Sequence, residues 1–511
     1  MRLFARAADA TVIAEAWDSR ATWRALENTL TASAGSVVIS VVLGTALALA
    51  LGAFRMRGRV AMTFLALSPL LIPSQIMALA WIELAGMLIP GPNPIYSGTG
   101  IALLMGVEHM PLVFIAVRAA LKAIPADLVE AARIGGASQG AILRRVILPL
   151  CFPACGAGSA LAFAAAVGNF GVPALLGIPG RFPMLTTLIY QRLNGFGPSI
   201  LGQVAVLALL LVALAGAALA LRALTLRLAV PVPQGRAFDR PPAPRKVTMA
   251  VWAGLVLLMV TPMLALLGTA LAPALGVKLS LDTASLSNFA QVAASPTIRR
   301  AFVNSLLLSV AAAVISTAIA LPFAWLAQVA RSRAMRLLDW LADAPFVVPG
   351  TVLALAVILT FLPPLPILGV SVYGTPAILL LAYLARFLPL ALRPLSAAAA
   401  STDPALDEAA RIFGAPVRAR IARIFAPPVA APALAGAVLI FMTAFNELTL
   451  SALLWSSGNE TLGVMIFSLQ YEGNSTGAAA LSVLSLLLVA GLALVLDRAC
   501  RGREGVLPWR D

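Results

Sequence analysis

Two stretches of this sequence carry the same charged, glycine-containing phrase: EAARIGGASQG runs from Glu130 to Gly140, and EAARIFGAPVR runs from Glu408 to Arg418. The phrases begin 278 residues apart in a chain that is 61% hydrophobic and only 11% charged. An ordinary soluble domain has about 25% charged residues. Runs of about 20 apolar residues, long enough to cross a hydrocarbon core of ~30 Å, recur along the whole chain. The composition predicts an all-α polytopic membrane protein, and the repeated phrase predicts two similar halves.

Apolar length and flanking charge predict eleven membrane spans. They cover residues 31–54, 61–88, 100–121, 151–168, 200–224, 248–272, 303–328, 340–362, 376–398, 429–450 and 479–497. The segment 227–246 is rich in Pro and Arg and too polar to span, so it reads as a cytoplasmic linker. We predict a first membrane domain at 1–226, the linker at 227–246 and a second membrane domain at 247–511. The span at 248–272 has no counterpart in the first half, so eleven spans and twelve, with a first span lost, both stay open.

The halves match beyond the opening phrase. ENTL at residues 27–30 matches VNSL at 303–306, and SPLLIP at 68–73 matches APFVVP at 344–349, both 276 residues apart. Pro149 matches Pro427 at the offset of 278. An ordered series of matches at nearly one offset indicates a duplication.

The net charge of +15 is concentrated in short loops that follow apolar runs. The arginines concerned are Arg55, Arg57, Arg59, Arg331, Arg333, Arg336, Arg498, Arg501 and Arg503. Such loops are typical of cytoplasmic faces, whereas a basic stripe with interleaved aromatic residues, as nucleic-acid binding requires, is absent from the sequence. Counting spans from the linker places both EAA phrases in the cytoplasm, the repeats parallel, and the N-terminal thirty residues outside the cytoplasm.

Each EAA phrase predicts a bent segment between two spans. Pro125 opens the first copy and Asp403 with Pro404 opens the second, since proline and acidic residues suit the first turn of a helix. Gly136 and Gly414 then end a short helix through a left-handed turn. A second helix is expected to run to Pro149 or Pro427.

The spacing of the phrase resembles a known signature: EAA, three residues, Gly, nine residues, an aliphatic residue, one residue, then Leu-Pro. The first copy fits in full, with Val146 and Leu148-Pro149, and the second has Ile424 but Ala426 before Pro427. This is similar to the cytoplasmic motif of permease subunits of ATP-binding-cassette importers. The chain looks like the fused, two-domain permeases of the ferric-iron and thiamine group, and the segment at 170–190 is similar to that of the ferric-iron members.

The resemblance implies that each EAA segment is a coupling helix seated on one of two copies of a separate ATPase subunit. The implied coupling residues are Glu130, Ala131, Ala132, Gly136, Pro149, Glu408, Ala409, Ala410, Gly414 and Pro427. It further implies a multi-pass protein of the bacterial inner membrane, in contact with the lipid bilayer and served by a periplasmic substrate-binding protein. No GxxxxGK[ST] phosphate loop occurs in the sequence, so we expect no enzymatic activity and no cofactor in this chain, with ATP-Mg on the partner ATPase.

Polar residues inside spans are the candidates for the passage, because they are costly in lipid. They are Glu83, Glu108, His109, Asn169, Arg386, Asn446 and Glu447. Hydrated helix ends and substrate contact both explain Glu83 and Glu447, and His109 reads as a packing residue. Glu108 and Arg386 are equivalent at the 278 offset, so we predict either that they pair as a gate or that each reaches water separately.

Other functions compete with this interpretation. Thiamine, polyamine, phosphonate or sulfate are alternatives to ferric iron. A secondary transporter has the same composition but no use for two EAA segments, and a membrane enzyme requires a convergent catalytic set that the sequence lacks. Cys151, Cys155 and Cys500, with the single His109, do not have the spacing of a metal site.

Overall fold

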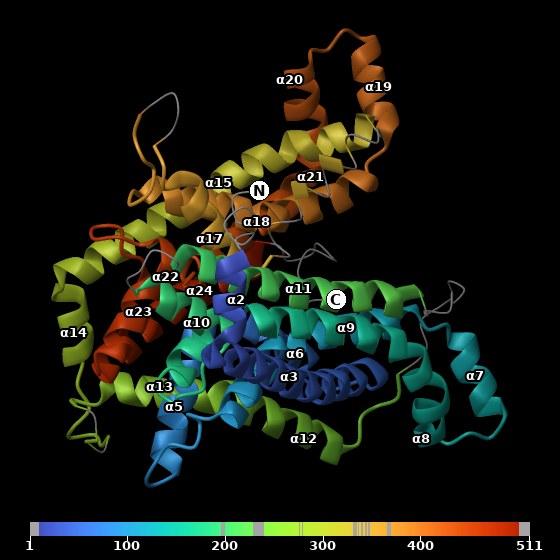
Figure 1. The fold of residues 1–511 in the computed structure, drawn as a ribbon. Helices are drawn as coiled ribbons and strands as arrows, with labels where there is room; N and C mark the ends of the chain where they lie inside the picture. The colour runs from blue at the N-terminus through green and yellow to red at the C-terminus, as the bar shows by residue number, and fades with distance from the viewer. Residues whose placement is uncertain are drawn as a thin grey trace. The chain divides into compact units, whose positions relative to one another are not determined.

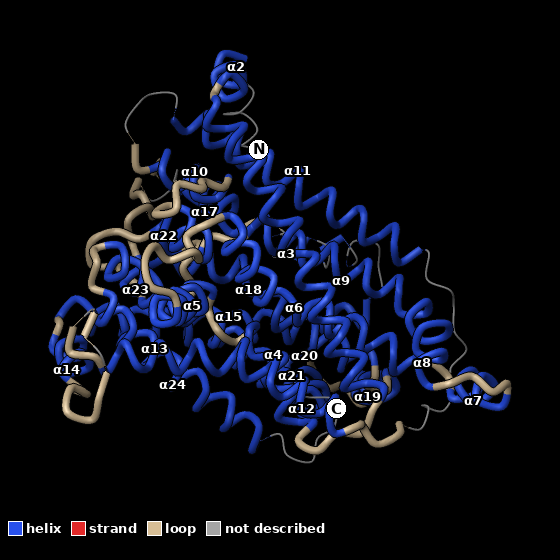
Figure 2. Tube along the Cα trace, turned by 90° about the horizontal axis from the view of Figure 1, so that it is seen from below, coloured by secondary structure: helices blue, strands red, loops and turns tan. Residues whose placement is uncertain are grey.

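The structure, a computed structural model, consists of helices and their connections (Figures 1 and 2), with no strand among the residues described. These residues are 10–195, 200–227, 240–274, 276–277, 279–330, 335, 337–338, 341–342, 345, 348–364 and 369–499. Most of the predicted linker, Arg331, Arg333, Arg336, Arg501 and Arg503 lie outside them. The helical, two-repeat membrane fold expected from the composition is confirmed.

Packing divides the described residues into two compact units, a first unit up to Thr269 and a second unit from Ala270 onward. Each unit has its own bundle of long helices. The division between them falls near the end of the span that follows the predicted linker, and not at the linker itself.

In the first unit, α3, α6, α9 and α11 pack side by side as the central bundle (Figure 1). The α-helices of this unit are α2 (Ala10–Asp18), α3 (Arg20–Ala53), α4 (Arg59–Leu67), α5 (Ser74–Leu88), α6 (Gly98–Ala123), α7 (Ala126–Ile134), α8 (Gln139–Ile142), α9 (Leu148–Gly168), α10 (Leu185–Leu193), α11 (Ile200–Arg227), α12 (Arg245–Leu255) and α13 (Thr261–Leu271, whose last two residues pass into the second unit). A 3-10 turn, η1 (Ser68–Leu70), and three π-helical turns, η2 (Leu143–Ile147), η3 (Pro173–Gly177) and η4 (Val256–Val260), connect or interrupt them.

In the second unit, α15, α18 and α21 pack against one another in the same manner. The elements of this unit are α14 (Ser287–Ala294), α15 (Pro296–Ala330), α17 (Gly350–Phe361), α18 (Pro376–Ala400), α19 (Pro404–Ile412), α20 (Val417–Ala419), the π-helical turn η5 (Arg420–Phe425), α21 (Ala426–Phe445), α22 (Ser451–Leu454), α23 (Leu462–Tyr471) and α24 (Ser475–Ala499). α15, α18 and α21 follow in the order of α3, α6 and α9, as a duplication requires.

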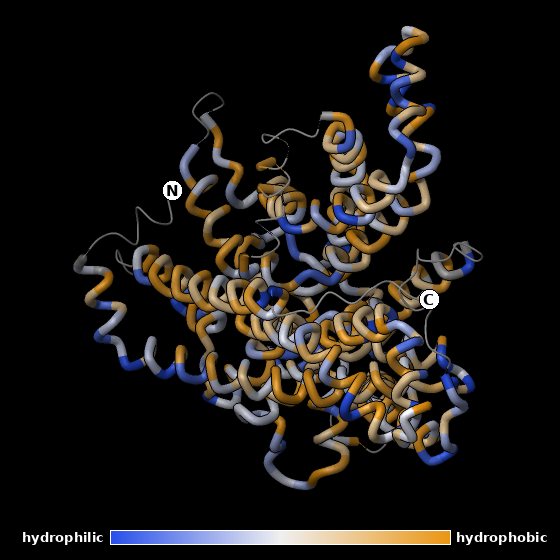
Figure 3. Tube along the Cα trace, turned by 90° about the vertical axis from the view of Figure 1, so that its right-hand side faces the viewer, coloured by the Kyte–Doolittle hydropathy of each residue, from blue (hydrophilic) through white to orange (hydrophobic). Residues whose placement is uncertain are grey.

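Nine of the eleven predicted spans lie in helices long and apolar enough to cross a membrane, within the described residues. A tenth, 61–88, is a pair of helices bent by 106° at a short break. For the eleventh, 340–362, the structure describes only the short helix α17 and a few residues before it. Figure 3 shows the long helices as mainly hydrophobic, with hydrophilic residues gathered toward helix ends and connections. The chain is therefore a multi-pass membrane protein.

Prolines set the breaks in the two equivalent spans. Pro73 precedes α5 with φ −58° and ψ 141°, and Pro349 precedes α17 with φ −50° and ψ 138°. A proline has no N–H to continue the helical ladder and clashes with the preceding turn. The matched stretches SPLLIP and APFVVP thus both end in a proline with the same extended backbone conformation, directly before a helix.

The span that follows the linker packs on the first unit. Met259 lies in a buried cluster with Met77, Val107 and Met110. Thr269 Oγ1, in α13, donates a hydrogen bond of 2.8 Å to Glu83 Oε2. This span has no counterpart among the predicted spans of the first half, and its packing explains why the compact units do not divide at the linker.

Candidate functional sites: two EAA segments and two polar clusters

The two EAA segments, residues 126–149 and 404–427, begin with the expected short helices. Pro125 is the extended residue before α7, and Asp403 precedes α19. The Ala405 N–H donates a 3.0 Å hydrogen bond to Asp403 Oδ1, which caps one of the free amides of the first turn. The helix starts predicted from the sequence are confirmed.

The glycine turns are confirmed in both copies. Gly136 has φ 78° and Gly414 has φ 75°, which is left-handed backbone. The N–H of Ala137 reaches back to the carbonyl of Ala132 at 3.0 Å, five residues earlier, and Ala415 does the same to Ala410 at 3.0 Å. This is the Schellman arrangement, which satisfies carbonyls at the end of a helix.

The second limb of each segment does not stop at its proline, as the sequence suggested, but continues into the next span. One helix runs from Gln139 to Gly168, and another runs from Val417 to Phe445. A π-helical turn, η2 or η5, lies directly before α9 or α21, in which Pro149 or Pro427 occupies the first turn. The looser turn accommodates a residue that lacks the N–H of a regular helix. A turn about Gly136 or Gly414 is therefore joined rigidly to a spanning helix.

The tips of both EAA segments expose apolar side chains. Ile134 is 88% exposed and its equivalent Ile412 is 83% exposed, with Phe413 beside it at 89%. The glutamates of the motif differ, since Glu130 is half-buried and Glu408 is exposed. Each tip therefore exposes an apolar side chain, and the second tip exposes two next to each other.

In the first unit, two of the listed polar residues, Glu108 and Asn169, are in contact, which the sequence did not predict. Asn169 Nδ2 donates a 2.9 Å hydrogen bond to Glu108 Oε2, and Asn169 Oδ1 accepts one of 3.1 Å from the Val172 N–H. Thr186 Oγ1 donates to the Asn169 carbonyl at 2.9 Å. We call Glu108 and Asn169 the first polar cluster.

In the second unit, Arg386 donates hydrogen bonds to the carbonyls of Pro345, at 3.3 Å, and Val348. Both carbonyls lie just before Pro349, which has no N–H to offer the carbonyl of Pro345 four residues earlier, so Arg386 supplies a donor near this break. Glu447 accepts from the Leu450 N–H at 2.8 Å, and from the N–H of Ser451 at 3.0 Å. Arg386 and Glu447, with the neighbouring Asn446, form the second polar cluster.

At the offset of 278, Glu447 corresponds to Asn169, and the side chain of each accepts a hydrogen bond from the N–H three residues later. Asn446 Oδ1 accepts a 2.6 Å hydrogen bond from Ser485 Oγ. Glu108 and Arg386 each have hydrogen-bond partners within their own unit, so neither charge depends on the other for a partner. Their pairing stays a prediction. Glu83 accepts a hydrogen bond from Thr269, and His109 is buried at 6% exposure.

The residues matched as ENTL and VNSL hold the N-terminal part of α3 and of α15 through a pair of hydrogen bonds in each unit. The sequence matched these residues but did not show their partners. Asn28 Nδ2 donates to the Pro183 carbonyl at 2.9 Å, and Thr29 Oγ1 accepts from the Leu185 N–H at 2.9 Å. These residues of α3 lie near its N-terminal end, whereas Ala53 at the other end lines a cavity with the first EAA segment. The match of ENTL with VNSL thus marks a clamp at the end opposite the EAA segments.

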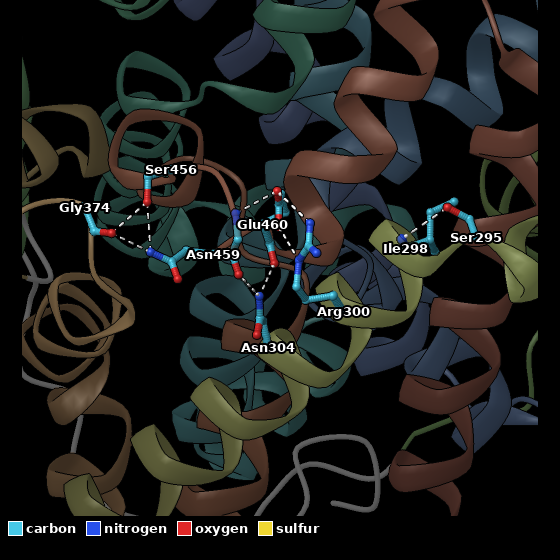
Figure 4. A network of polar contacts seen from close by, with 9 residues as sticks. Ser295, Ile298, Arg300, Asn304, Gly374, Ser456, Asn459 and Glu460 are labelled. Atoms are coloured by element: carbon cyan, nitrogen blue, oxygen red, sulfur yellow. Dashed lines mark hydrogen bonds and ion pairs between the residues drawn. The ribbon is translucent and has the colours of Figure 1, made fainter.

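The second unit repeats this clamp and adds an ion pair to it (Figure 4). Asn304 Nδ2 donates to the Glu460 carbonyl at 3.0 Å. Ser305 Oγ accepts from the Leu462 N–H at 2.8 Å. Arg300 forms an ion pair with Glu460, with Nε and Oε2 3.1 Å apart, where the equivalent Arg24 reaches only a carbonyl at 3.4 Å. The matched sequence identifies Asn304 and Ser305, but their partners about 155 residues away were visible only in the fold.

Comparison with known proteins was made on the whole sequence. The family described as "Binding-protein-dependent transport system inner membrane component" matches residues 29–226 and 320–501. The "Probable ABC transporter permease protein y4fN" of Sinorhizobium fredii is 31% identical over 406 residues, which are 76% of this chain and 70% of that protein.

Two shorter relatives match parts of the chain. The "Molybdenum transport system permease protein ModB" of Mycobacterium bovis is 32% identical over 27% of this chain and 56% of its own length. The "Spermidine/putrescine transport system permease protein PotC" of Escherichia coli is 28% identical over 35% of this chain and 66% of its own length. The two carry different substrates in their names.

Proposed function

Because this chain belongs to the family of binding-protein-dependent transport system inner membrane components, which matches it in two repeats, we propose that it forms the substrate passage of an ATP-binding-cassette importer and couples it to separate ATPase subunits. The family establishes the class of protein, a transport permease. The passage, the coupling surface, the partners and the substrate are proposals, each with its own support.

The observation that carries the coupling role is the geometry common to the two EAA segments. Both present a short helix, a Schellman turn and an exposed isoleucine at equivalent positions, Ile134 and Ile412, 88% and 83% exposed. Covering an apolar side chain of this size removes surface that costs free energy in water, ~25 cal/mol per Å². Two tips of similar geometry fit two copies of one ATPase subunit. ATP-Mg is bound and hydrolysed on those ATPase subunits.

The continuous helix after each turn supports a mechanism for coupling. A partner that grips the tip holds one end of a rigid body whose other end is the span α9 or α21. A displacement of the tip is therefore transmitted to the span without bending at Pro149 or Pro427. The partner shifts the equilibrium of the passage only through its different affinity for the two states.

The test of coupling is copurification from native membranes. Ile134→Asp and Ile412→Asp, each with a charge in place of an exposed apolar side chain, should reduce the ATPase recovered with the tagged permease at least tenfold. Leu281→Asp is the matched control, because Leu281 is 99% exposed and belongs to neither EAA segment. Equal ATPase recovery with all three variants would exclude the tips as the docking surface.

For the substrate, we propose ferric iron delivered by a periplasmic binding protein, with the permease in the bacterial inner membrane. The support is the sequence resemblance of residues 170–190 to the ferric-iron members. Much of that segment is packed inside the first unit: Phe170 is 1% exposed and its ring lies 5.3 Å from that of Tyr190. The similarity of this segment to the ferric-iron members therefore reflects shared packing more than shared contact with a substrate.

The relatives named for molybdenum and for spermidine and putrescine make polyamine import, among the alternatives from the sequence, the next candidate. Uptake of labelled ferric iron, putrescine and molybdate into cells with and without the chain separates them. Loss of iron uptake alone in the deletion supports the proposal, and loss of either other uptake with normal iron uptake replaces it.

A further inference from the structure

The two EAA segments are attached to their spans by different chemistry at equivalent positions. At the offset of 278 that aligns the motif, Val129 corresponds to Asp407 and Ile142 corresponds to Arg420. Val129 and Ile142 are each 1% exposed and line, with Ala53 and others, a cavity of only about 100 Å³. The first EAA segment is thus held by apolar packing.

In the second EAA segment, Asp407 and Arg420 form a two-pronged ion pair. Arg420 Nε donates to Asp407 Oδ1 at 3.0 Å, and Arg420 Nη2 donates to Oδ2. Trp325 of α15 joins them, since its Nε1 donates to Asp407 Oδ1 at 3.0 Å and its ring lies under the guanidinium, 5.2 Å from Cζ. A second hydrogen bond ties the same helix to the residues before α19, from Gln328 Nε2 to the Thr402 carbonyl at 2.9 Å.

Apolar packing does not hold α19 in the way it holds α7. No residue of α19 is buried, whereas Ala126 and Val129 of α7 are buried. A cavity of about 450 Å³ lies between α15 and the second EAA segment, lined by Trp325 and Asp407 among others. With so little apolar contact, the polar contacts of Asp407 and Thr402 carry the attachment.

The ion pair is well shielded, because the side chain of Arg420 is 9% exposed and that of Asp407 is 17% exposed. A shielded pair of this kind is sensitive to the loss of one member, which leaves an unpaired charge, and is tolerant of replacing both members by apolar residues of similar volume. The first EAA segment already shows an apolar solution at the same two positions.

We propose that Asp407, Arg420 and Trp325 are positioning residues that fix α19 to α15 through an ionic brace, and that this brace replaces the Val129–Ile142 packing of the first EAA segment. The brace makes the second tip and its spanning helices move as one body. The inference rests on the proposed coupling function, because positioning matters for transport only if the tips dock the ATPase.

The first experiment measures the brace without any partner. Spin labels on cysteines introduced at Ala405 and Leu326, both exposed and on α19 and α15, report the distance between these helices in the full chain with its own cysteines replaced. Asp407→Val and Arg420→Ile should each broaden the distance distribution. The double variant, which carries the residues of the first EAA segment, should narrow it again. An unchanged distribution in both single variants would overturn the brace.

The second experiment measures transport in the assembled importer. Each single variant should lower transport per molecule of ATP hydrolysed at least tenfold, and the double variant should recover to within about threefold of the original, at equal membrane levels of the chain. Trp325→Phe keeps the ring and removes the donor, so it should give an intermediate loss. Additive loss in the double variant would overturn the positioning role.

The two experiments separate the inference from the proposed function. Broadened distances with normal transport and normal ATPase recovery would leave the brace standing and would reject coupling through the second tip. Unchanged distances with lost transport would reject the brace and would assign Asp407 and Arg420 to direct contact with a partner. Recovery of the narrow distance distribution and of transport in the double variant supports both the brace and the coupling role.

Discussion

Gly136 and Gly414 hold the same left-handed backbone conformation, at φ 78° and 75°, at equivalent positions of the two EAA segments. A Cβ atom added at either glycine would meet no neighbour within 4 Å. Steric contact therefore does not reserve these positions for glycine, and backbone conformation does. A substitution at either position tests the turn itself.

Gly136→Val and Gly414→Val should strain the turn by ~1–3 kcal/mol and uncouple ATP hydrolysis from transport. Asparagine, which tolerates left-handed backbone, should have a milder effect. Gly140→Val is the control, since Gly140 also faces open space but is helical. Normal transport by both valine variants at Gly136 and Gly414 would show that the turns are not part of coupling.

The purified chain, reconstituted in lipid alone, should hydrolyse no ATP. The sequence contains no phosphate loop, and the proposed site of hydrolysis is a separate subunit. Phosphate release is the measurement, with the assembled importer as the positive control. Hydrolysis that persists in a preparation free of other ATPases would contradict the proposal that ATP is hydrolysed only on a separate subunit.

A cysteine at Ser19 should react with a membrane-impermeant thiol reagent added outside intact spheroplasts, because the span count places the N-terminal thirty residues outside the cytoplasm. Ser19 Oγ accepts a 3.0 Å hydrogen bond from Arg192, so the exposed Asp18 serves as a second labelling site. A cysteine at the exposed Ser401, near the second EAA segment, should react only after lysis. The reverse pattern would invert the topology.

Glu108→Arg and Arg386→Glu should each impair transport, since each loses hydrogen bonds within its own unit. If the two residues meet as a gate, the double exchange restores transport at least tenfold over either single variant, and this is the expected result. Glu108→Gln is the control that keeps an acceptor for Asn169. Losses that simply multiply would show that the contacts within each unit account for both residues.

Stability of the second clamp should depend on pH through Glu460. Burial raises the pKa of this carboxyl, but hydrogen bonds from Arg300 and the Gly458 N–H outweigh burial and lower the pKa below its usual value of 4.5. A lowered pKa contributes stability that is present above the ordinary pKa and is lost as the pH falls through the lowered pKa.

Glu460→Gln should therefore lower the midpoint of thermal unfolding at pH 7, by the equivalent of ~1 kcal/mol because Arg300 is half exposed. The difference should shrink below the usual pKa and vanish as the pH falls through the lowered pKa of Glu460. Arg24→Met, in the clamp of the first unit, removes only a 3.4 Å contact with a carbonyl and should have a smaller effect without this pH dependence. A pH-independent difference for Glu460→Gln would show that its charge is not what stabilises the clamp.

The class of fold, the duplication and the local geometry of the EAA segments could be predicted from the order of the residues alone. Apolar runs predict spans because the bilayer has one thickness, and glycine at Gly136 and Gly414 predicts a turn because few other residues adopt left-handed backbone. Helix starts and the proline breaks at Pro73 and Pro349 are local effects in the same sense. All of these depend on residues within a few positions of one another.

Contacts between distant segments could be seen only once the helices were packed together. It placed Asn169 beside Glu108, tied Arg386 to the carbonyls before Pro349, and brought Trp325 to Asp407. The sequence showed that Asp407 and Arg420 replace Val129 and Ile142 at equivalent positions, but not that these residues touch. A hydrogen bond or an ion pair forms within about 3 Å, and partners tens of residues apart reach that distance only when the spans pack.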